Sequence, residues 1–168
     1  FVNMLDKGEG GNLFLPVDTT AMGASTGQDM STPYNQNRAN IHLHGGLTPW
    51  ISDGTPNQWT TPAGDTTKYP KGVSVVGVPD MPDISGPTDS GTKNDGTLTF
   101  YYTNKQSARL MWYHDHTYGM TRLNVYAGEV STFKLQDAKE KALIASGVLP
   151  SNEYTLAIQD KTFVPSNK

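Results

Sequence analysis

The stretch RLMWYHDH, residues 109–116, alternates between two faces along its whole length. One face carries Leu110, Trp112, His114 and His116, and the other carries Met111, Tyr113 and Asp115. Successive side chains of an extended chain point to opposite faces, so this pattern, with its aromatic residues, is typical of a β-strand. The stretch therefore predicts a strand that ends in two histidines.

Short strand patterns of the same kind recur along the chain, separated by turn-forming residues. They lie at residues 40–44, 72–78 (a strand or a sheet edge), 96–103, 123–128, 130–135 and 154–159. The only predicted helix spans residues 137–146. It ends before Gly147, and glycine is a favourable residue just beyond a helix C-terminus. With 17 glycines and 11 prolines in 168 residues, turns interrupt the chain often, and the predicted class is all-β.

Charge and composition exclude several classes of function. The formal net charge is −3 with no run of like charges, which disfavours a nucleic-acid partner. No stretch of about 18 apolar residues is present, so no membrane span is predicted. The absence of cysteine excludes disulfides, thiolate nucleophiles and thiolate metal ligands.

All four histidines of the chain lie in two His-x-His pairs, His42 with His44 and His114 with His116. Residues i and i+2 of a strand share a face and stand about 6.5–7 Å apart. Such a pair reaches two neighbouring metal ions more naturally than one, so two facing pairs favour a multinuclear cluster. Imidazole suits Cu, Zn, Fe and Ni, and the missing cysteine disfavours a structural zinc site. Asp115 lies on the opposite face and is interpreted as a hydrogen-bond acceptor.

Both histidine blocks carry flanking sequence that resembles the multicopper oxidases, in particular the branch of bacterial spore-coat laccases and bilirubin oxidases. The first block is HLHGGLTP at residues 42–49, followed by SDG at 52–54 and by Trp59. The second is WYHDH at residues 112–116, followed by TRLNVYAG at 121–128. The two blocks in this order make the resemblance specific, and it extends over the whole chain.

The resemblance implies a cupredoxin-like Greek-key β-sandwich or barrel. This domain is expected to be incomplete, because the family's first domain has strands that would lie upstream of Phe1. The implied division is residues 1–136 as cupredoxin-like domain 1, residues 137–153 as a linker containing the short helix, and residues 154–168 as the start of domain 2.

Carried over residue by residue, the resemblance implies that His42 binds a type 2 copper. His44 and His114 would bind one type 3 copper, and His116 would bind the other. Asp53 would help to deliver protons during oxygen reduction, or alternatively is only a turn residue of the SDG sequence. A C-terminal domain would supply the other cluster ligands and the type 1 copper site, because this chain has no cysteine and no fifth histidine.

The implied function is that of a laccase-like oxidase, which couples one-electron oxidation of phenolic or related substrates to four-electron reduction of dioxygen to water. This chain would supply half of the ligands of the trinuclear copper cluster. Its partners would be the remaining domains, dioxygen and a small aromatic reducing substrate bound elsewhere, and the chain alone is predicted to be inactive. The family suggests a secreted, periplasmic or spore-coat location, which the sequence itself does not decide.

Two alternatives stay open at this level. One is a non-catalytic copper-binding module with a cupredoxin-like fold, although the six methionines are scattered and form no cluster. The other is a hydrolase with a dinuclear zinc site. That class is disfavoured because it requires a continuous His-x-His-x-Asp-His run, whereas Gly45 and Gly46 follow the first pair here.

Overall fold

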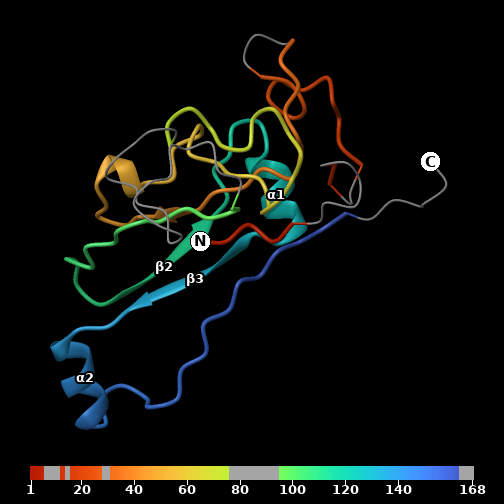
Figure 1. Cartoon of the computed structure of the whole chain (residues 1–168). Helices are drawn as coiled ribbons and strands as arrows, with labels where there is room; N and C mark the ends of the chain where they lie inside the picture. Colours follow the sequence, from red (N-terminus) through yellow and green to blue (C-terminus); the bar gives the residue numbers. More distant parts are fainter. Residues whose placement is uncertain (6–11, 14–15, 28–30, 76–94, 163–168) are drawn as a thin grey trace.

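The computed structural model describes residues 1–5, 12–13, 16–27, 31–75 and 95–162, and it is built on one antiparallel sheet (Figure 1). The strands are β1 (His42–His44), β2 (Arg109–His114) and β3 (Val130–Leu135), with β2 in the centre. The helices found in these ranges are the 3₁₀ turn η1 (Trp50–Ser52), α1 (Thr121–Ala127) and α2 (Ala138–Ala145). An antiparallel sheet with two α-helices agrees with the predicted class, an incomplete cupredoxin-like β fold.

The register of the sheet brings the two histidine blocks together. His42 pairs with His114, and His44 pairs with Trp112, across the β1–β2 ladder. On the other side of β2, Met111 pairs with Phe133. Because paired residues of an antiparallel ladder present their side chains to the same face, the three histidines of β1 and β2 share one face.

Four predicted elements are confirmed, one of them with the predicted bounds and three with slightly different bounds. The predicted strands at 40–44, 109–116 and 130–135 correspond to β1, β2 and β3. The predicted helix at 137–146 corresponds to α2, where Oδ1 of Asp137 accepts from the Glu140 N–H at 2.8 Å and so caps the first turn. Gly147 follows with φ +76°, the left-handed conformation expected just after a helix.

The strand predicted at residues 123–128 is wrong, and so is the prediction of a single helix. Residues 123–127 belong to α1, which ends at Ala127 and is followed by the C-cap residue Gly128 with φ +117°. The run TRLNVYA is too short to distinguish a period of 2 from a period of 3.6. Packing decides the outcome, because Asn124 is fully buried and its Nδ2 donates to the Arg38 carbonyl at 2.9 Å.

Residues 96–103, which were predicted to form a strand, join no ladder. Thr97 forms an isolated bridge with Val2, and the Leu98 N–H donates to the Phe1 carbonyl. The alternation of exposure is nevertheless present, since Leu98 is buried and Tyr101 is exposed. The Tyr101 N–H donates to Oγ of Ser52 at 2.7 Å, so a side chain takes the place of a strand partner.

Two further predicted strands are also absent from the described structure. Residues 73–75 form a turn, with the Val75 N–H donating to the Gly72 carbonyl, while 76–78 lie outside the described residues. Residues 154–159 form no ladder and are exposed. Side-chain bonds hold this segment instead: Oγ1 of Thr132 donates to Oγ1 of Thr155, and Nε2 of Gln159 donates to the Val125 carbonyl.

The packed centre beside the sheet is unusually polar. Its large buried apolar side chains include Trp59 and Met120, but the side chain of Arg38 is also fully buried, with its guanidinium 5.0 Å from the ring centroids of both Tyr34 and Trp59. Other fully buried polar side chains are Asn37, Asn40, Gln58, Thr60, Thr61, Asp115, Thr117 and Asn124. Buried polar groups are stable only when they are hydrogen-bonded, so this centre fixes the loops by directed contacts.

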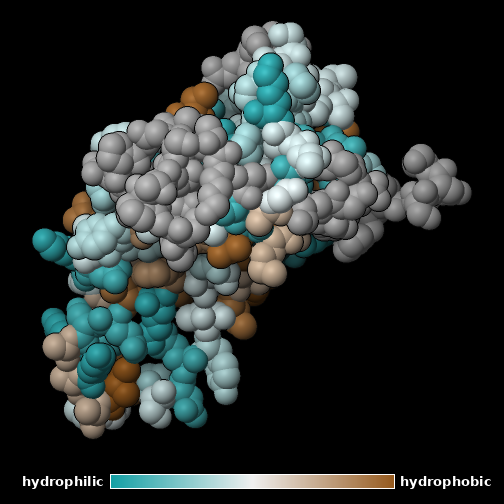
Figure 2. Space-filling view, in the orientation of Figure 1, coloured by the Kyte–Doolittle hydropathy of each residue, from teal (hydrophilic) through white to brown (hydrophobic). Residues whose placement is uncertain are grey.

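The surface carries scattered hydrophobic side chains. On the face shown in Figure 2, brown patches lie between larger hydrophilic areas. Within the part of the chain that the structure describes, no helix is long and apolar enough to cross a bilayer.

Candidate metal centre

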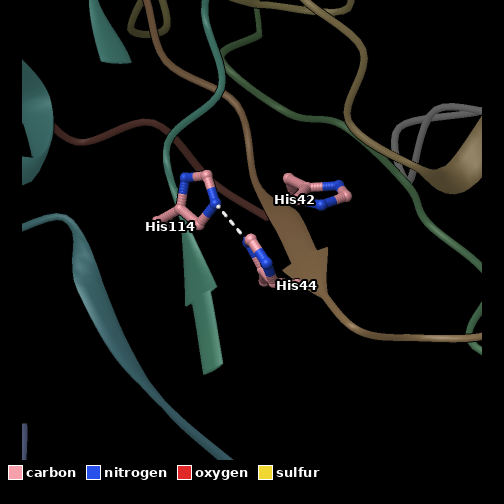
Figure 3. A group of neighbouring side chains, drawn as sticks. All are labelled: His42, His44 and His114. Atoms are coloured by element: carbon pink, nitrogen blue, oxygen red, sulfur yellow. Dashed lines mark hydrogen bonds between the residues drawn. The ribbon is translucent and has the colours of Figure 1, made fainter. Parts of the chain in front are cut away.

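The four histidine rings gather at the end of the β1–β2 ladder. Ring nitrogens of His42, His44 and His114 all lie within 4.8 Å of one another (Figure 3). His116 lies outside this group of three, but its ring centroid is 5.1 Å from that of His42 and 5.7 Å from that of His114. The structure therefore brings together all four histidines that the sequence singles out.

Hydrogen bonds to backbone carbonyls orient two of the rings, His42 and His114. Nδ1 of His42 is 2.6 Å from the Asp53 carbonyl, and Nδ1 of His114 is 2.7 Å from the Asp115 carbonyl. A neutral imidazole that donates from Nδ1 presents its Nε2 lone pair to the site, where it can accept a hydrogen bond or bind a metal. Nδ1 of His44 lies 3.2 Å from Nε2 of His114, so these two nitrogens face each other across the site. The donor set is all imidazole, which suits copper.

The environment favours the neutral, metal-binding form of two of these rings. Burial lowers the pKa of His114 and of His116, against smaller raising effects of backbone hydrogen bonds. The neighbouring histidines lower both pKa values further. Nδ1 of His116 is buried without a hydrogen-bond partner, so this ring retains an unsatisfied nitrogen beside the cluster.

Asp53 stands beside the cluster and also serves the turn. Its Oδ1 is 3.3 Å from Nδ1 of His42 and accepts from Oγ1 of Thr48 at 3.1 Å. Its backbone N–H donates to the Trp50 carbonyl and ends η1. The half-exposed carboxylate therefore contacts both solvent and a candidate ligand, and its role in proton delivery stays a prediction.

Asp115 points away from the rings and supports the loop, as its place on the opposite face predicts. Its buried carboxylate accepts from the Asn40 N–H at 3.0 Å and from the N–H and Oγ1 of Thr117 at 2.9 and 2.8 Å. Burial raises the pKa of Asp115, while these hydrogen bonds act in the opposite direction. The carboxylate is an acceptor in a network, and it offers no ligand to the cluster.

Two residues of the site were not found from the sequence. The ring of Trp112 stacks on His44 at 4.7 Å between centroids and lies 4.6 Å from His114. Asn40 joins the approach to β1 with the segment after β2. Trp112 could have been found from its place on the histidine face of 109–116, whereas Asn40 gives no signal until the register is known.

The motif GASTG at residues 23–27 fits the letters of a serine-hydrolase elbow, but its setting does not. That motif requires a sharp turn from a strand into a helix. Residues 21–27 form turns and bends, with an isolated bridge between Thr26 and Pro33. No nucleophile is therefore presented in that way.

A cavity lies on the other side of the sheet. It has a volume of about 690 Å³, and its lining includes Leu43, Tyr113 and Phe133. Leu43 and Tyr113 alternate with the histidines along their strands, so they face away from the cluster. Glu129 also lines this cavity, and burial raises the pKa of Glu129 to about 8, with a smaller contribution from the negative charge of Asp115.

The raised pKa of Glu129 predicts a pH-dependent stability. The folded protein holds the proton of the Glu129 carboxyl group more tightly than the unfolded chain does. The contribution of this group to the free energy of unfolding is therefore complete below about pH 4.5 and is lost as the pH rises through about 8. We expect the free energy of unfolding to fall by up to about 1.4 kcal/mol per pH unit across this window. Glu129→Gln should flatten that slope, as measured by urea unfolding at several pH values. Ser131→Ala, in the same cavity, should keep it; an unchanged slope in Glu129→Gln would contradict the assignment.

Comparison with known proteins identifies the family. The sequence is 35% identical over 151 residues to a laccase of Bacillus subtilis, covering 89% of this chain and 23% of that laccase. A bilirubin oxidase of Albifimbria verrucaria is 39% identical over 77 residues, 40% of this chain and 13% of that protein. The chain belongs to the multicopper oxidase family. A multicopper oxidase of Arabidopsis thaliana is a further relative, 34% identical over 96 residues, which are 57% of this chain and 12% of that protein.

The match is to a part of these oxidases. The chain spans 23% of the length of the Bacillus laccases, and no family model matches it. Membership of the multicopper oxidases implies copper, and the all-imidazole donor set at the end of the β1–β2 ladder fits that metal.

Proposed function

We propose that this chain is the first-domain part of a laccase-like multicopper oxidase and supplies half of the ligands of its trinuclear copper cluster. The whole oxidase would couple one-electron oxidation of phenolic or related substrates to four-electron reduction of dioxygen to water. The observation that carries this proposal is that the rings of both His-x-His pairs lie close together at the end of the β1–β2 ladder.

Each side chain of the site has a defined part in this proposal. His42 would hold the type 2 copper, His44 and His114 one type 3 copper, and His116 the other. The carbonyls of Asp53 and Asp115 orient His42 and His114 by accepting from Nδ1. The half-exposed carboxylate of Asp53 lies between solvent and His42, a suitable place for passing protons toward the cluster.

The remaining parts of the oxidase would complete the site. When bound, copper supplies the electron transfer and the reduction of dioxygen. Residues 1–136 would form domain 1, 137–153 the linker and 154–168 the start of domain 2. The other domains would bring the opposing ligands, the type 1 copper and the pocket for a small aromatic reducing substrate. The chain alone would therefore be inactive as an oxidase.

Copper binding by the purified chain is the first test. We expect Cu(II) to bind with nitrogen coupling in the electron paramagnetic resonance (EPR) spectrum and without the blue type 1 signal. His44→Ala and His114→Ala should each weaken binding at least about 10-fold, since each removes a ligand. Met4→Leu is the control, because Met4 is an exposed soft ligand of the kind that a copper-storage module would use.

Two outcomes would count against the proposal. Unchanged copper affinity in both histidine variants would contradict the ligand assignment. Copper binding without dioxygen-dependent oxidation of phenols, in the oxidase assembled with its remaining domains, would favour the non-catalytic copper-binding alternative.

A further inference from the structure

The β1–β2 ladder stops at the pair His42–His114, and two buried side chains take over where it ends. Continuing the register by two residues would place Asn40 opposite His116, and such a pair of an antiparallel ladder exchanges two backbone hydrogen bonds. Here the His116 N–H donates to Oδ1 of Asn40 at 3.1 Å, and the Asn40 N–H donates to Oδ2 of Asp115 at 3.0 Å. Side-chain oxygens therefore take the positions that carbonyls would fill in a continued ladder.

The hydrogen bonds of Asn40 and Asp115, here called the Asn40–Asp115 bridge, also hold a third segment of the chain. Nδ2 of Asn40 donates to the Thr55 carbonyl at 2.9 Å, directly after the turn that contains Asp53. Asp115 also accepts two hydrogen bonds from Thr117. Asn40 and Asp115 are both fully buried, and a buried carboxylate is costly unless donors surround it. These donors make the bridge a rigid link between the approach to β1, the exit from β2 and the Asp53 turn.

The bridge joins the two histidines whose rings are closest. The centroids of His42 and His116 are 5.1 Å apart, against 5.6 Å for His42 and His44 and 5.7 Å for His114 and His116. Asn40 is two residues before His42, and its Oδ1 holds the backbone of His116. The two histidine pairs therefore come closest to each other at the point where the side chains of Asn40 and Asp115 replace the backbone hydrogen bonds of the ladder.

We propose that Asn40 and Asp115 are positioning residues, which set the separation and direction of the two histidine pairs for a shared metal cluster; this rests on the metal-binding function proposed above. Neither side chain offers a ligand. Asn40 acts through the backbone of His116, and Asp115 acts through the backbone of Asn40. Residues that orient metal ligands in this way typically change metal affinity about 10–100-fold when they are replaced.

The test compares Asn40→Ala and Asp115→Asn with Asn3→Ala in the complete oxidase. Asn3 is a matched control, because it is a buried amide that donates to two carbonyls, those of Asn37 and Thr60. All three variants should lower Tm. Only Asn40→Ala and Asp115→Asn should weaken Cu(II) binding, by about 10–100-fold, and change the EPR spectrum of the bound copper. Wild-type affinity and spectrum in these two folded variants, or equal weakening by Asn3→Ala, would overturn the proposal.

A metal-free measurement separates this proposal from the function on which it rests. This measurement uses the present chain alone, which has four histidines, so its ring ¹⁵N nuclear magnetic resonance signals report directly on the site. We expect the His114 and His116 signals to shift in Asp115→Asn and to stay unchanged in Asn3→Ala. Unshifted signals in Asp115→Asn would overturn the positioning role, whether or not copper binds. Shifted signals in a protein whose wild type binds no copper would support the positioning role and overturn the proposed function.

Discussion

Replacing Arg38 by leucine is expected to destabilise the protein by about 3–5 kcal/mol, enough to prevent folding of a marginally stable domain. The buried guanidinium donates from Nε to the Asn35 carbonyl at 2.6 Å and from Nη1 to the Tyr118 carbonyl at 3.1 Å. Nη2 donates to the carbonyls of Gly23 and Ala24. Without these donors the carbonyls stay buried and unpaired, and each such loss costs about 1–3 kcal/mol.

Arg38→Lys gives a measurable version of the same prediction. Burial lowers the pKa of Arg38 to about 10, and the guanidinium remains charged at neutral pH. An ammonium keeps the charge but cannot reach carbonyls in three directions while it contacts the rings of Tyr34 and Trp59. We expect a loss of about 2–3 kcal/mol in urea unfolding.

The exposed Arg122 provides the control for this change. Arg122→Lys should alter the free energy of unfolding by less than about 0.5 kcal/mol. Equal effects of Arg38→Lys and Arg122→Lys would show that the hydrogen bonds of the buried Arg38 guanidinium contribute little to stability.

The sequence predicted the parts of the fold in which local pattern and final packing agree. The stretch at 109–116 alternates strongly, and the sheet uses that alternation as β2. At 123–128 the pattern was too short, and the buried amide of Asn124 with the left-handed Gly128 produced a helix instead. At 96–103 the faces were right but the ladder was absent, because strand pairing depends on a partner that the pattern does not name.

In the candidate site, too, the sequence was sufficient to predict some residues and not others. Histidine spacing was sufficient to single out all four rings, and the register then showed that they meet. Among the supporting residues, Arg38 and Asn40 could not be found, because their partners are remote in the sequence. Arg38 bonds to a carbonyl 80 residues away, and Asn40 bonds to His116, 76 residues away. Such contacts arise from tertiary packing and leave no period in the sequence.

Gly54→Ala is expected to disturb the metal centre more than any other single methyl group added to a glycine beside it. Gly54 has φ +68°, and a Cβ there would lie 2.1 Å from the Ile41 carbonyl oxygen and 2.9 Å from the His42 nitrogen. Both neighbours are backbone atoms, so relief requires the chain entering β1 to move. His42 would move with it, and its hydrogen bond to the Asp53 carbonyl would be lost. We expect copper binding to weaken at least about 10-fold.

Gly147→Ala separates steric displacement from backbone strain. Gly147 has a similar φ of +76°, but nothing lies within 4 Å of its added Cβ, so this variant bears only the cost of the left-handed conformation, about 1–2 kcal/mol. Gly54→Ala should cost a further 1–3 kcal/mol, about the usual penalty of overpacking, and it alone should change copper affinity. If both variants lower Tm equally and leave copper binding intact, the close approach of the Asp53 turn to β1 does not control the position of His42.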